Sequence, residues 1–391
     1  DPDQPYLVVA PFYGDHESVS ALRASKLNLL FYATRAITVL REGALEGVTA
    51  MNIVLTTPDA WLETTPEEEP KLDPGEKAGQ LGVVAISKRP IAADKKRNDE
   101  ARLVVFGDTQ VLLDLFGIEL PIIQAPMAGA GLADLAVAVA EAGGLGSLPC
   151  ALLSPDQLRD QTQLFRQRTA KPINMNFFCH RTPDMDPGRE AAWRRRLEPY
   201  YREFGLDPEA PIPASSRAPF DDAFCDLVEE LRPEVVSFHF GLPGRRLLDR
   251  VVATGAKIVS SATTVAEARW LESEGCDAVI AQGAEAGGHR GMFLTEDIAT
   301  QVGTFSLVPQ VADAVKVPVI AAGGIGDGRG IAAAFMLGAA AAQIGTAYLF
   351  CPESTIAAPH RRALLAADAR ETALTNVFTG RPARGFVNRI V

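Results

Sequence analysis

The sequence predicts an α/β fold in which a (β/α)8 TIM barrel over about residues 113–391 follows a small α/β segment over residues 1–110. Two observations predict the barrel. From residue 121 onward, eight short apolar runs alternate with Ala-rich stretches of helical character, as expected for buried parallel strands and the helices that cover them. Polar and glycine-rich motifs follow these runs, where such barrels hold their active sites. A doubly wound sheet is the alternative architecture.

The eight expected strands cover residues 121–125, 144–148, 172–177, 235–240, 257–261, 278–282, 318–322 and 342–347. Helical stretches lie between them at residues 132–142, 155–168, 243–253, 264–274, 307–314 and 328–337. Residues 180–222 are too long for an ordinary connection between a strand and a helix. We therefore expect a lid or cap inserted after the third strand.

The first part of the chain has a looser pattern. Strands are expected at residues 6–10, 51–56, 81–86 and 103–106, with a Pro-rich acidic loop between the second and third. The runs LTTPDAWLET, GQLGVVAISKR and ARLVVFGDT resemble the soluble domain of auxiliary proteins of gliding-motility-type ABC transporters. In that family a membrane helix follows the GD motif, whereas here the chain continues into the barrel. No catalytic residue is identifiable in this segment.

Composition narrows the function classes. With 38 Lys and Arg against 49 Asp and Glu, the net charge is −11, which repels nucleic-acid phosphates and anionic membrane surfaces. The dense basic cluster Arg194–Arg196 has Glu190, Glu198 and Glu203 around it, so we interpret it as a solvated helix face. We expect no nucleic-acid partner.

The cysteines and the apolar runs indicate the compartment. Five widely spaced cysteines without a CxxC motif favour neither a disulfide framework nor a zinc site, and we expect no metal. No apolar run is long enough for a membrane span, and the sequence contains no basic-then-apolar signal segment. We expect a protein of the reducing cytoplasm, although a processed start stays open because Asp1 replaces an initiating Met. The oligomeric state is left open.

Two glycine-rich loops predict a phosphate site. AAGGIGDGRG at 321–330 follows one expected strand and begins a helix, and QIGT at 343–346 ends the next. Glycines turn tightly there, and free backbone N–H groups with a helix N-terminus can face an anion. Phosphate is commonly held at the last two strands of a barrel. Dinucleotide binding fits less well, because the expected acidic residue is missing.

A monophosphate site in a barrel whose first strand ends in APM suggests FMN. Ala125, Pro126 and Met127 can lie against the flavin ring, while Asn176 and Gln282 offer amide groups to its polar edge. Ordinary packing is the alternative interpretation of each of these residues.

His239 is the clearest catalytic candidate. It ends an expected strand, where strand alternation should turn it away from Phe238 and Phe240. Its near-neutral reference pKa suits proton transfer, and the alternative is a structural histidine. His289, in EAGGHRG, is interpreted as a residue that orders its loop. His180 can line a site, but a nucleophilic pair with Cys179 is disfavoured because adjacency in sequence does not bring side chains together.

Taken together, QAPMAG, GGLGSL, NMNFFCH, SFHFGLP, SSATTVAEA, QGAEAGGHRG, AAGGIGDGRG and QIGTAYL resemble the nitronate monooxygenases, formerly called 2-nitropropane dioxygenases, over about residues 113–391. The resemblance implies an FMN-dependent TIM barrel that oxidises alkyl nitronates or nitroalkanes with O₂ to a carbonyl compound and nitrite. It implies His239 as the catalytic base. The residues that it implies around FMN are Ala125, Pro126, Met127, Asn176, Gln282, Gly287, Gly288, Gly323, Gly324, Gln343, Gly345 and Thr346.

Two other functions stay open. One is an FMN-dependent enoyl-ACP reductase, whose family shares the QAPM-like, EAGGH and GGI motifs, although SFHFG argues against it. The other is a degenerate barrel in a transporter-associated fusion protein. The nitronate monooxygenases also continue beyond FTGRPARG at 378–385, whereas this chain stops at Val391. We therefore expect a barrel truncated at its C-terminus, with apolar surface left uncovered.

Overall fold

The structure is a computed structural model that describes residues 109–182, 184, 186–211, 219–366 and 371–389, together with five short strands nearer the N-terminus. Among those five, β1 (Tyr6–Val9) pairs antiparallel with β2 (Leu30–Ala33). A second small sheet contains β3 (Thr49–Ala50), β4 (Ser87–Pro90) and β5 (Glu100–Ala101). The strand expected at 6–10 is confirmed. Those expected at 51–56, 81–86 and 103–106 lie outside the described residues.

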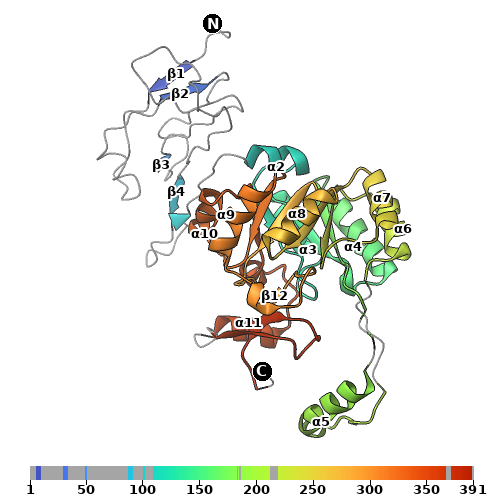
Figure 1. Ribbon diagram of the computed structural model, residues 1–391. Coiled ribbons are helices and arrows are strands. Elements are labelled where there is room, and N and C mark those ends of the chain that lie inside the picture. Colours follow the sequence, from blue (N-terminus) through green and yellow to red (C-terminus); the bar gives the residue numbers. More distant parts are fainter. Residues whose placement is uncertain are drawn as a thin grey trace.

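Eight parallel strands form a barrel, which confirms the predicted fold class (Figure 1). In spatial order the sheet runs β6-β14-β13-β11-β10-β9-β8-β7. The strands are β6 (Ile122–Gln124), β7 (Gly146–Pro149), β8 (Ile173–Phe178), β9 (Val235–His239), β10 (Lys257–Ala262), β11 (Ala278–Gln282), β13 (Val319–Ala322) and β14 (Ala341–Ile344). A parallel bridge between Ile123 and Leu145 joins the two end strands. All eight C-termini consequently lie at one end of the barrel.

The expected strand positions agree closely with the observed ones, except at the last strand. A strand was expected over 342–347, but β14 ends at Ile344 because Gly345 leaves the extended region (φ −112°, ψ −80°) and the 3-10 helix η4 (Thr346–Phe350) follows. An apolar run of small residues predicts a buried strand but does not fix where the chain turns out of it.

Helices surround the barrel and complete its core. Seven of them lie against the strands: α3 (Ala133–Glu141), α4 (Pro155–Arg168), α6 (Asp222–Leu231), α7 (Arg245–Ala253), α8 (Val265–Ser273), α9 (Thr304–Ala314) and α10 (Gly328–Met336). A large apolar cluster that includes Phe165, Phe177 and Phe238 fills the layer between strands and helices. A second cluster fills the barrel interior.

The helix α2 (Thr109–Phe116) closes the N-terminal end of the barrel. Its Leu112 and Phe116 are buried in the same apolar cluster as Ile123, Val235 and Ile320 of the barrel interior. Figure 1 shows α2 at one end of the barrel and β12 (Gly288–His289) with α11 (Ala358–Leu365) at the other. With one end filled by apolar side chains, only the end where the strands finish is available for chemistry.

The residues inserted after β8 contain a helix, α5 (Pro187–Glu203), none of whose residues is buried. Asp186 caps it by accepting from the N–H groups of Gly188 and Arg189. Figure 1 shows α5 standing apart from the barrel, so α5 itself does not close the mouth as the expected lid would. It contacts the end of the chain, where the Tyr200 hydroxyl donates to the Arg389 carbonyl at 2.8 Å.

Residues near the C-terminus cover the strand ends. A three-stranded antiparallel sheet is formed by β12, β16 (Ala383–Phe386) and β15 (Thr372–Thr375), in that order. The Arg290 N–H donates to the Pro382 carbonyl beside this sheet. The segment from Thr372 to Phe386 is therefore joined to the loop that follows β11.

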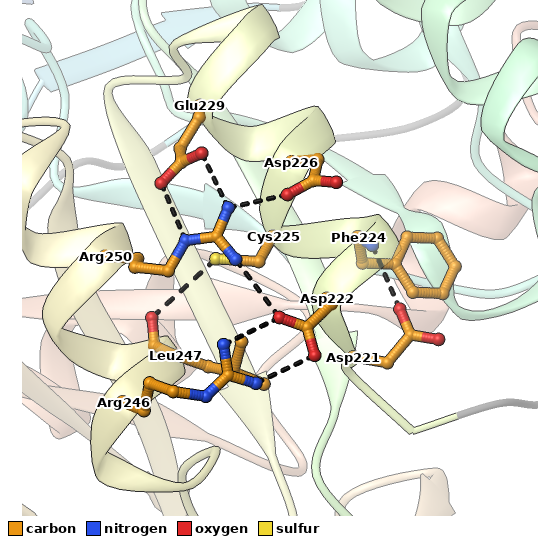
Figure 2. Close-up of polar contacts among 9 residues, drawn as sticks. All are labelled: Asp221, Asp222, Phe224, Cys225, Asp226, Glu229, Arg246, Leu247 and Arg250. Carbon is orange, nitrogen blue, oxygen red and sulfur yellow. Dashed lines mark hydrogen bonds and ion pairs between the residues drawn. The ribbon is translucent and has the colours of Figure 1, made fainter.

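Away from the mouth, an ion-pair cluster joins α6 to α7. Arg250 contacts the carboxylates of Asp222, Asp226 and Glu229, and Arg246 binds Asp222 through both guanidinium nitrogens (Figure 2). Hydrogen bonds from Arg246 lower the pKa of Asp222, and hydrogen bonds from Arg250 lower the pKa of Glu229. Since these groups are largely exposed, the cluster fixes helix orientation more than it adds stability.

No helix in the part of the chain that the structure describes has the length and apolar character needed to cross a membrane.

The barrel closes where β6 meets β7, and a side chain completes that junction. Two backbone hydrogen bonds cross it, from Gln124 N–H to the Leu145 carbonyl and from Leu145 N–H to the Ile122 carbonyl. The fully buried Gln124 side chain then accepts from Ser147 N–H and donates to the Ser147 carbonyl, both at 3.1 Å. The Gln124 amide thus makes the hydrogen bonds between β6 and β7 that the two backbones do not make at Ser147.

We predict that Gln124→Leu lowers the free energy of unfolding by about 2 kcal/mol, because the buried N–H and carbonyl of Ser147 lose their partners. Urea unfolding followed by circular dichroism measures the change. Gln163→Leu is the matched control, since Gln163 is exposed on α4. Equal stability of the two variants would contradict a role of Gln124 in closure.

Candidate active site

The chemistry-bearing residues predicted from the sequence meet at the C-terminal end of the barrel. His239 ends β9, Gln282 ends β11, and Asn176 lies near the end of β8. Because all eight strands are parallel, these positions share one edge of the sheet. This mouth is bordered by the loop from Gly283 to Gly303 and by the sheet β12-β16-β15.

His239 is held through both ring nitrogens. Nδ1 lies 3.1 Å from the Ser261 hydroxyl, and Nε2 lies 3.3 Å from the His289 carbonyl oxygen. A carbonyl only accepts hydrogen bonds, so Nε2 carries the proton and Nδ1 of the neutral ring accepts from Ser261. The basic lone pair of His239 is therefore the one on Nδ1.

The surroundings keep His239 neutral. Burial, the largest cause, and the electrostatic effects of His289, Arg290 and Arg381 together lower the pKa of His239 to about 3, against the hydrogen bond to the His289 backbone. A ring that is neutral at physiological pH has the protonation state that a proton acceptor needs.

One sequence expectation about this strand end is wrong. Phe240 was expected on the opposite side from His239, but the two rings lie 4.5 Å apart between centroids. Phe240 adopts a left-handed conformation with φ +69°, which ends the alternation of the strand and brings its ring back beside His239. Phe238 is in the core as expected. A bulky residue in this conformation is uncommon and is found mainly at functional sites.

Three histidines surround two phenylalanine rings at the mouth. The Phe178 ring lies within 6.1 Å of the rings of His180, His239 and His289. Phe240 lies 5.9 Å from His180 and 5.8 Å from His289. The structure thus brings His180 into the site, as its position after β8 allowed. One wall of the mouth therefore combines two apolar phenylalanine rings with three imidazole rings.

The Gln282 side chain fixes the loop that carries His289. Its Nε2 donates to the His289 carbonyl at 3.0 Å and its Oε1 accepts from Gly291 N–H at 2.7 Å. The same carbonyl accepts from His239. Each amide atom of Gln282 retains one further hydrogen-bonding position, so a role toward a cofactor stays a prediction.

Arg290 is a buried residue that the sequence reasoning missed. Its guanidinium donates to the carbonyls of Gln282 and Gly283 and to the side chain of Gln301. Burial lowers the pKa of Arg290 to about 10, yet all of these partners are uncharged. A long cationic side chain beside the glycines of EAGGHRG resembles a surface residue in sequence, so only its fully buried position identifies it as a support of the loop.

Glu267 supports the same loop from α8. This fully buried carboxylate accepts from the N–H groups of Thr263, Phe293 and Leu294 and from the Thr263 hydroxyl. One carboxylate oxygen thus caps the start of α8 and the other holds the loop after β12. In the sequence, Thr264 followed three residues later by Glu267 has the spacing of a capping box, which points to a helix cap and not to support of a distant loop.

Glycine-rich segments from three strand ends converge beside the histidines. A methyl group placed on Gly323 (φ +117°) would lie 2.9 Å from the Ala286 nitrogen, and one on Gly287 would lie 3.7 Å from Thr346 Oγ1. Among the described residues, no acceptor is bonded to the N–H groups of Gly323, Gly324, Gly345 or Thr346. Unpaired backbone donors that converge form an anion cradle.

The helix that follows the cradle does not contribute as expected. Asp327 caps α10 by accepting from the N–H groups of Arg329 and Gly330, and it also binds the Arg329 guanidinium. A carboxylate already occupies the helix N-terminus that was expected to face an anion. The donors available for phosphate are those of the loop before the cap.

The remaining predicted residues lie close to this cradle or inside the barrel. Ala125 and Met127 are neighbours of Gly345, whose added methyl group would lie 3.5 Å from Ala125 Cβ and 3.7 Å from Met127 Sδ. Pro126 lies between them and Gly288 pairs with Arg384 in β12. Asn176 donates to Ser237 of β9. Gln343 faces the barrel interior, where its Oε1 has no partner among the described residues.

A family model described as nitronate monooxygenase matches residues 109–391. The chain belongs to the nitronate monooxygenase family. The nitronate monooxygenase of Pseudomonas aeruginosa is 46% identical over 277 residues, which cover 71% of this chain and 79% of the relative. That of Paraburkholderia phytofirmans is 44% identical over 281 residues, covering 71% and 76%. Like these nitronate monooxygenases, the chain is an oxidoreductase.

Two solved structures are similar to the chain in fold and sequence. Nitroalkane oxidase from Streptomyces ansochromogenes shares 42% identity and superposes with a TM-score of 0.66, covering 71% of this chain and 79% of the other. FabK from Thermotoga maritima shares 34% identity with a TM-score of 0.55, covering 71% and 74%. The chain therefore shares its barrel with a protein that is named as an oxidase of nitroalkanes.

The depressed pKa of His239 predicts a pH-dependent stability. Between its unfolded value near 6.5 and its folded value of about 3, the unfolded chain binds a proton that the native protein excludes, so stability falls as the pH falls. We expect a loss of about 2 kcal/mol between pH 7.5 and pH 5 that His239→Gln does not show. Urea unfolding of both proteins measures the difference, because all other titrating groups are common to them. Parallel pH profiles would contradict a buried neutral His239.

Proposed function

We propose that this protein is an FMN-dependent enzyme that oxidises alkyl nitronates, or the nitroalkanes from which they form, with O₂ to a carbonyl compound and nitrite. The observation that carries the proposal is the meeting of two features at one barrel mouth. A cradle of unpaired glycine N–H groups lies at the ends of β13 and β14, and a neutral histidine ends β9. Membership of the nitronate monooxygenase family supports it.

The residues present fit FMN. The N–H groups of Gly323, Gly324, Gly345 and Thr346 would hold the phosphate, where a side chain at Gly323 would collide with Ala286. Ala125, Pro126 and Met127, which border Gly345, would lie along the flavin ring. The remaining residues proposed around it are Asn176, Gln282, Gly287, Gly288 and Gln343. FMN, when bound, supplies electron transfer between the nitronate and O₂.

We further propose His239 as the base for neutral nitroalkanes. Its Nε2–H is held by the His289 carbonyl, so Nδ1 would take the α-proton once the Ser261 hydroxyl turns away. The walls formed by Phe178 and Phe240 keep water from the ring and from the carbanion-like product. A nitronate supplied as such has already lost this proton and needs no base.

The location in the reducing cytoplasm stays part of the proposal. All five cysteines are free thiols in the structure, and burial raises the pKa of Cys150, Cys179 and Cys276. Thiols held in this unreactive state are compatible with a reducing compartment and with no part in the reaction.

The cofactor and the reductant can be tested together. We expect purified protein to be yellow, with a flavin spectrum, and to be bleached anaerobically by ethylnitronate but not by NADH. A stopped-flow absorbance measurement compares the two. Rapid bleaching by NADH alone would instead support a reductase, and colourless protein that does not take up FMN would support a degenerate barrel.

The base assignment predicts a divided effect of one substitution. His239→Asn should lower kcat/KM for neutral nitroethane at least about 100-fold, the size of a general-base contribution, and leave ethylnitronate oxidation and FMN binding nearly unchanged. Oxygen consumption measures both substrates, with His360→Asn as an exposed control. If His289→Asn shows this pattern and His239→Asn does not, His289 is the base.

A further inference from the structure

Among the described residues, one cationic side chain at the mouth has no anionic partner. Arg381 lies in the loop that leads into β16, and its guanidinium carbon lies 4.9 Å from the centre of the Phe240 ring. Its one side-chain hydrogen bond within these residues, of 3.4 Å, goes to the Arg181 carbonyl. Within the described residues no carboxylate forms an ion pair with it, in contrast to Arg250, which contacts three.

Arg381 is near the proposed base without touching it. The Phe240 ring that it covers lies 4.5 Å from the His239 ring. The charge of Arg381 is among the causes that lower the pKa of His239. The Arg381 guanidinium and the His239 imidazole therefore both lie against the Phe240 ring.

The backbone around Arg381 is anchored to the loop that carries His289. Thr379 Oγ1 contacts the Arg381 carbonyl at 3.3 Å and His289 Nε2 at 2.8 Å. The next residue, Pro382, accepts from Arg290 N–H. The position of this cation is thus set by backbone contacts and not by a carboxylate, which leaves most of its N–H donors available for a ligand.

We propose that Arg381 binds the two oxygens of the nitronate and thereby gives the enzyme its preference for the anion over the neutral nitroalkane. A nitronate is planar and shares one negative charge between two oxygens, which matches the planar fork of donors on a guanidinium. The inference rests on the proposed function, because it names a residue for the substrate of that reaction.

The alternative is that Arg381 only stacks on Phe240 and supports its left-handed turn. A stacking role would affect both substrates equally, since the shape of the mouth would change for each. An anion-binding role raises KM only for the charged substrate, because the oxygens of the neutral one gain charge only as its proton leaves. The two KM values therefore separate the alternatives.

The experiment compares wild-type holoenzyme with Arg381→Met, Arg381→Lys and Arg195→Met, the last removing the same charge from an exposed position on α5. We expect Arg381→Met to raise KM for ethylnitronate at least about tenfold, with kcat for ethylnitronate and KM for neutral nitroethane little changed. Arg381→Lys should restore part of the loss, and Arg195→Met should resemble wild type. Titration with nitrate, a planar anion, followed by the flavin spectrum, should show the same order of affinity.

An equal rise in KM for ethylnitronate and nitroethane in Arg381→Met, or an unchanged nitrate affinity, would overturn the inference while the proposed function stands. Wild-type enzyme that binds FMN but does not oxidise ethylnitronate would overturn both. Circular dichroism and FMN content of each variant identify a variant that fails to fold, in which case Arg381→Lys carries the comparison.

Discussion

The pairing of eight strands in one direction is the constraint on which this molecule depends. It places every strand end at the same edge, so groups separated by more than two hundred residues, from Ala125 to Thr346, become neighbours. The ring of strands is completed at β6 and β7 by only two backbone hydrogen bonds, supplemented by the Gln124 side chain. On its other side β6 pairs with β14, where Ala125 N–H donates to the Ile344 carbonyl, so the strand that completes the ring also places Ala125 beside Gly345 of the cradle.

The mouth is organised by a single loop, residues 283–303. Three buried side chains hold this loop: Gln282 of β11, Glu267 of α8 and Arg290 of the loop itself. Buried charges are costly unless they are hydrogen-bonded, and here Glu267 accepts four hydrogen bonds while Arg290 donates to three acceptors. The consequence is a rigid His289 carbonyl, which in turn selects the tautomer of His239. The chemistry of one imidazole is thus determined by residues that do not touch it.

Much of this architecture could be predicted because its causes are local. Short apolar runs predict buried strands and the longer stretches between them predict helices, so the bounds of β11 and of α4 were found directly. What escaped prediction depends on contacts between distant residues. Nothing in the sequence near Phe240 announces a left-handed backbone, and the cap supplied by Asp327 competes with an anion only once the turn is formed. Arg290 and Arg381 read as surface residues until the fold surrounds them. The roles of individual residues toward FMN and substrate are matters of chemistry that the fold alone does not determine.

The pairing of β12 with β16 has a consequence for the order of folding. The two residues Gly288 and His289 find their strand partners at Arg384 and Ala383, almost one hundred positions later in the chain. During synthesis the barrel strands can assemble as they emerge, since each neighbours one made shortly before or after it, apart from the pair β6 and β14. The loop over the mouth cannot, because its partner strand β16 follows all eight barrel strands in the chain. A growing chain would therefore have a formed barrel before it has a formed site, and a ribosome-bound intermediate would be folded without being catalytic.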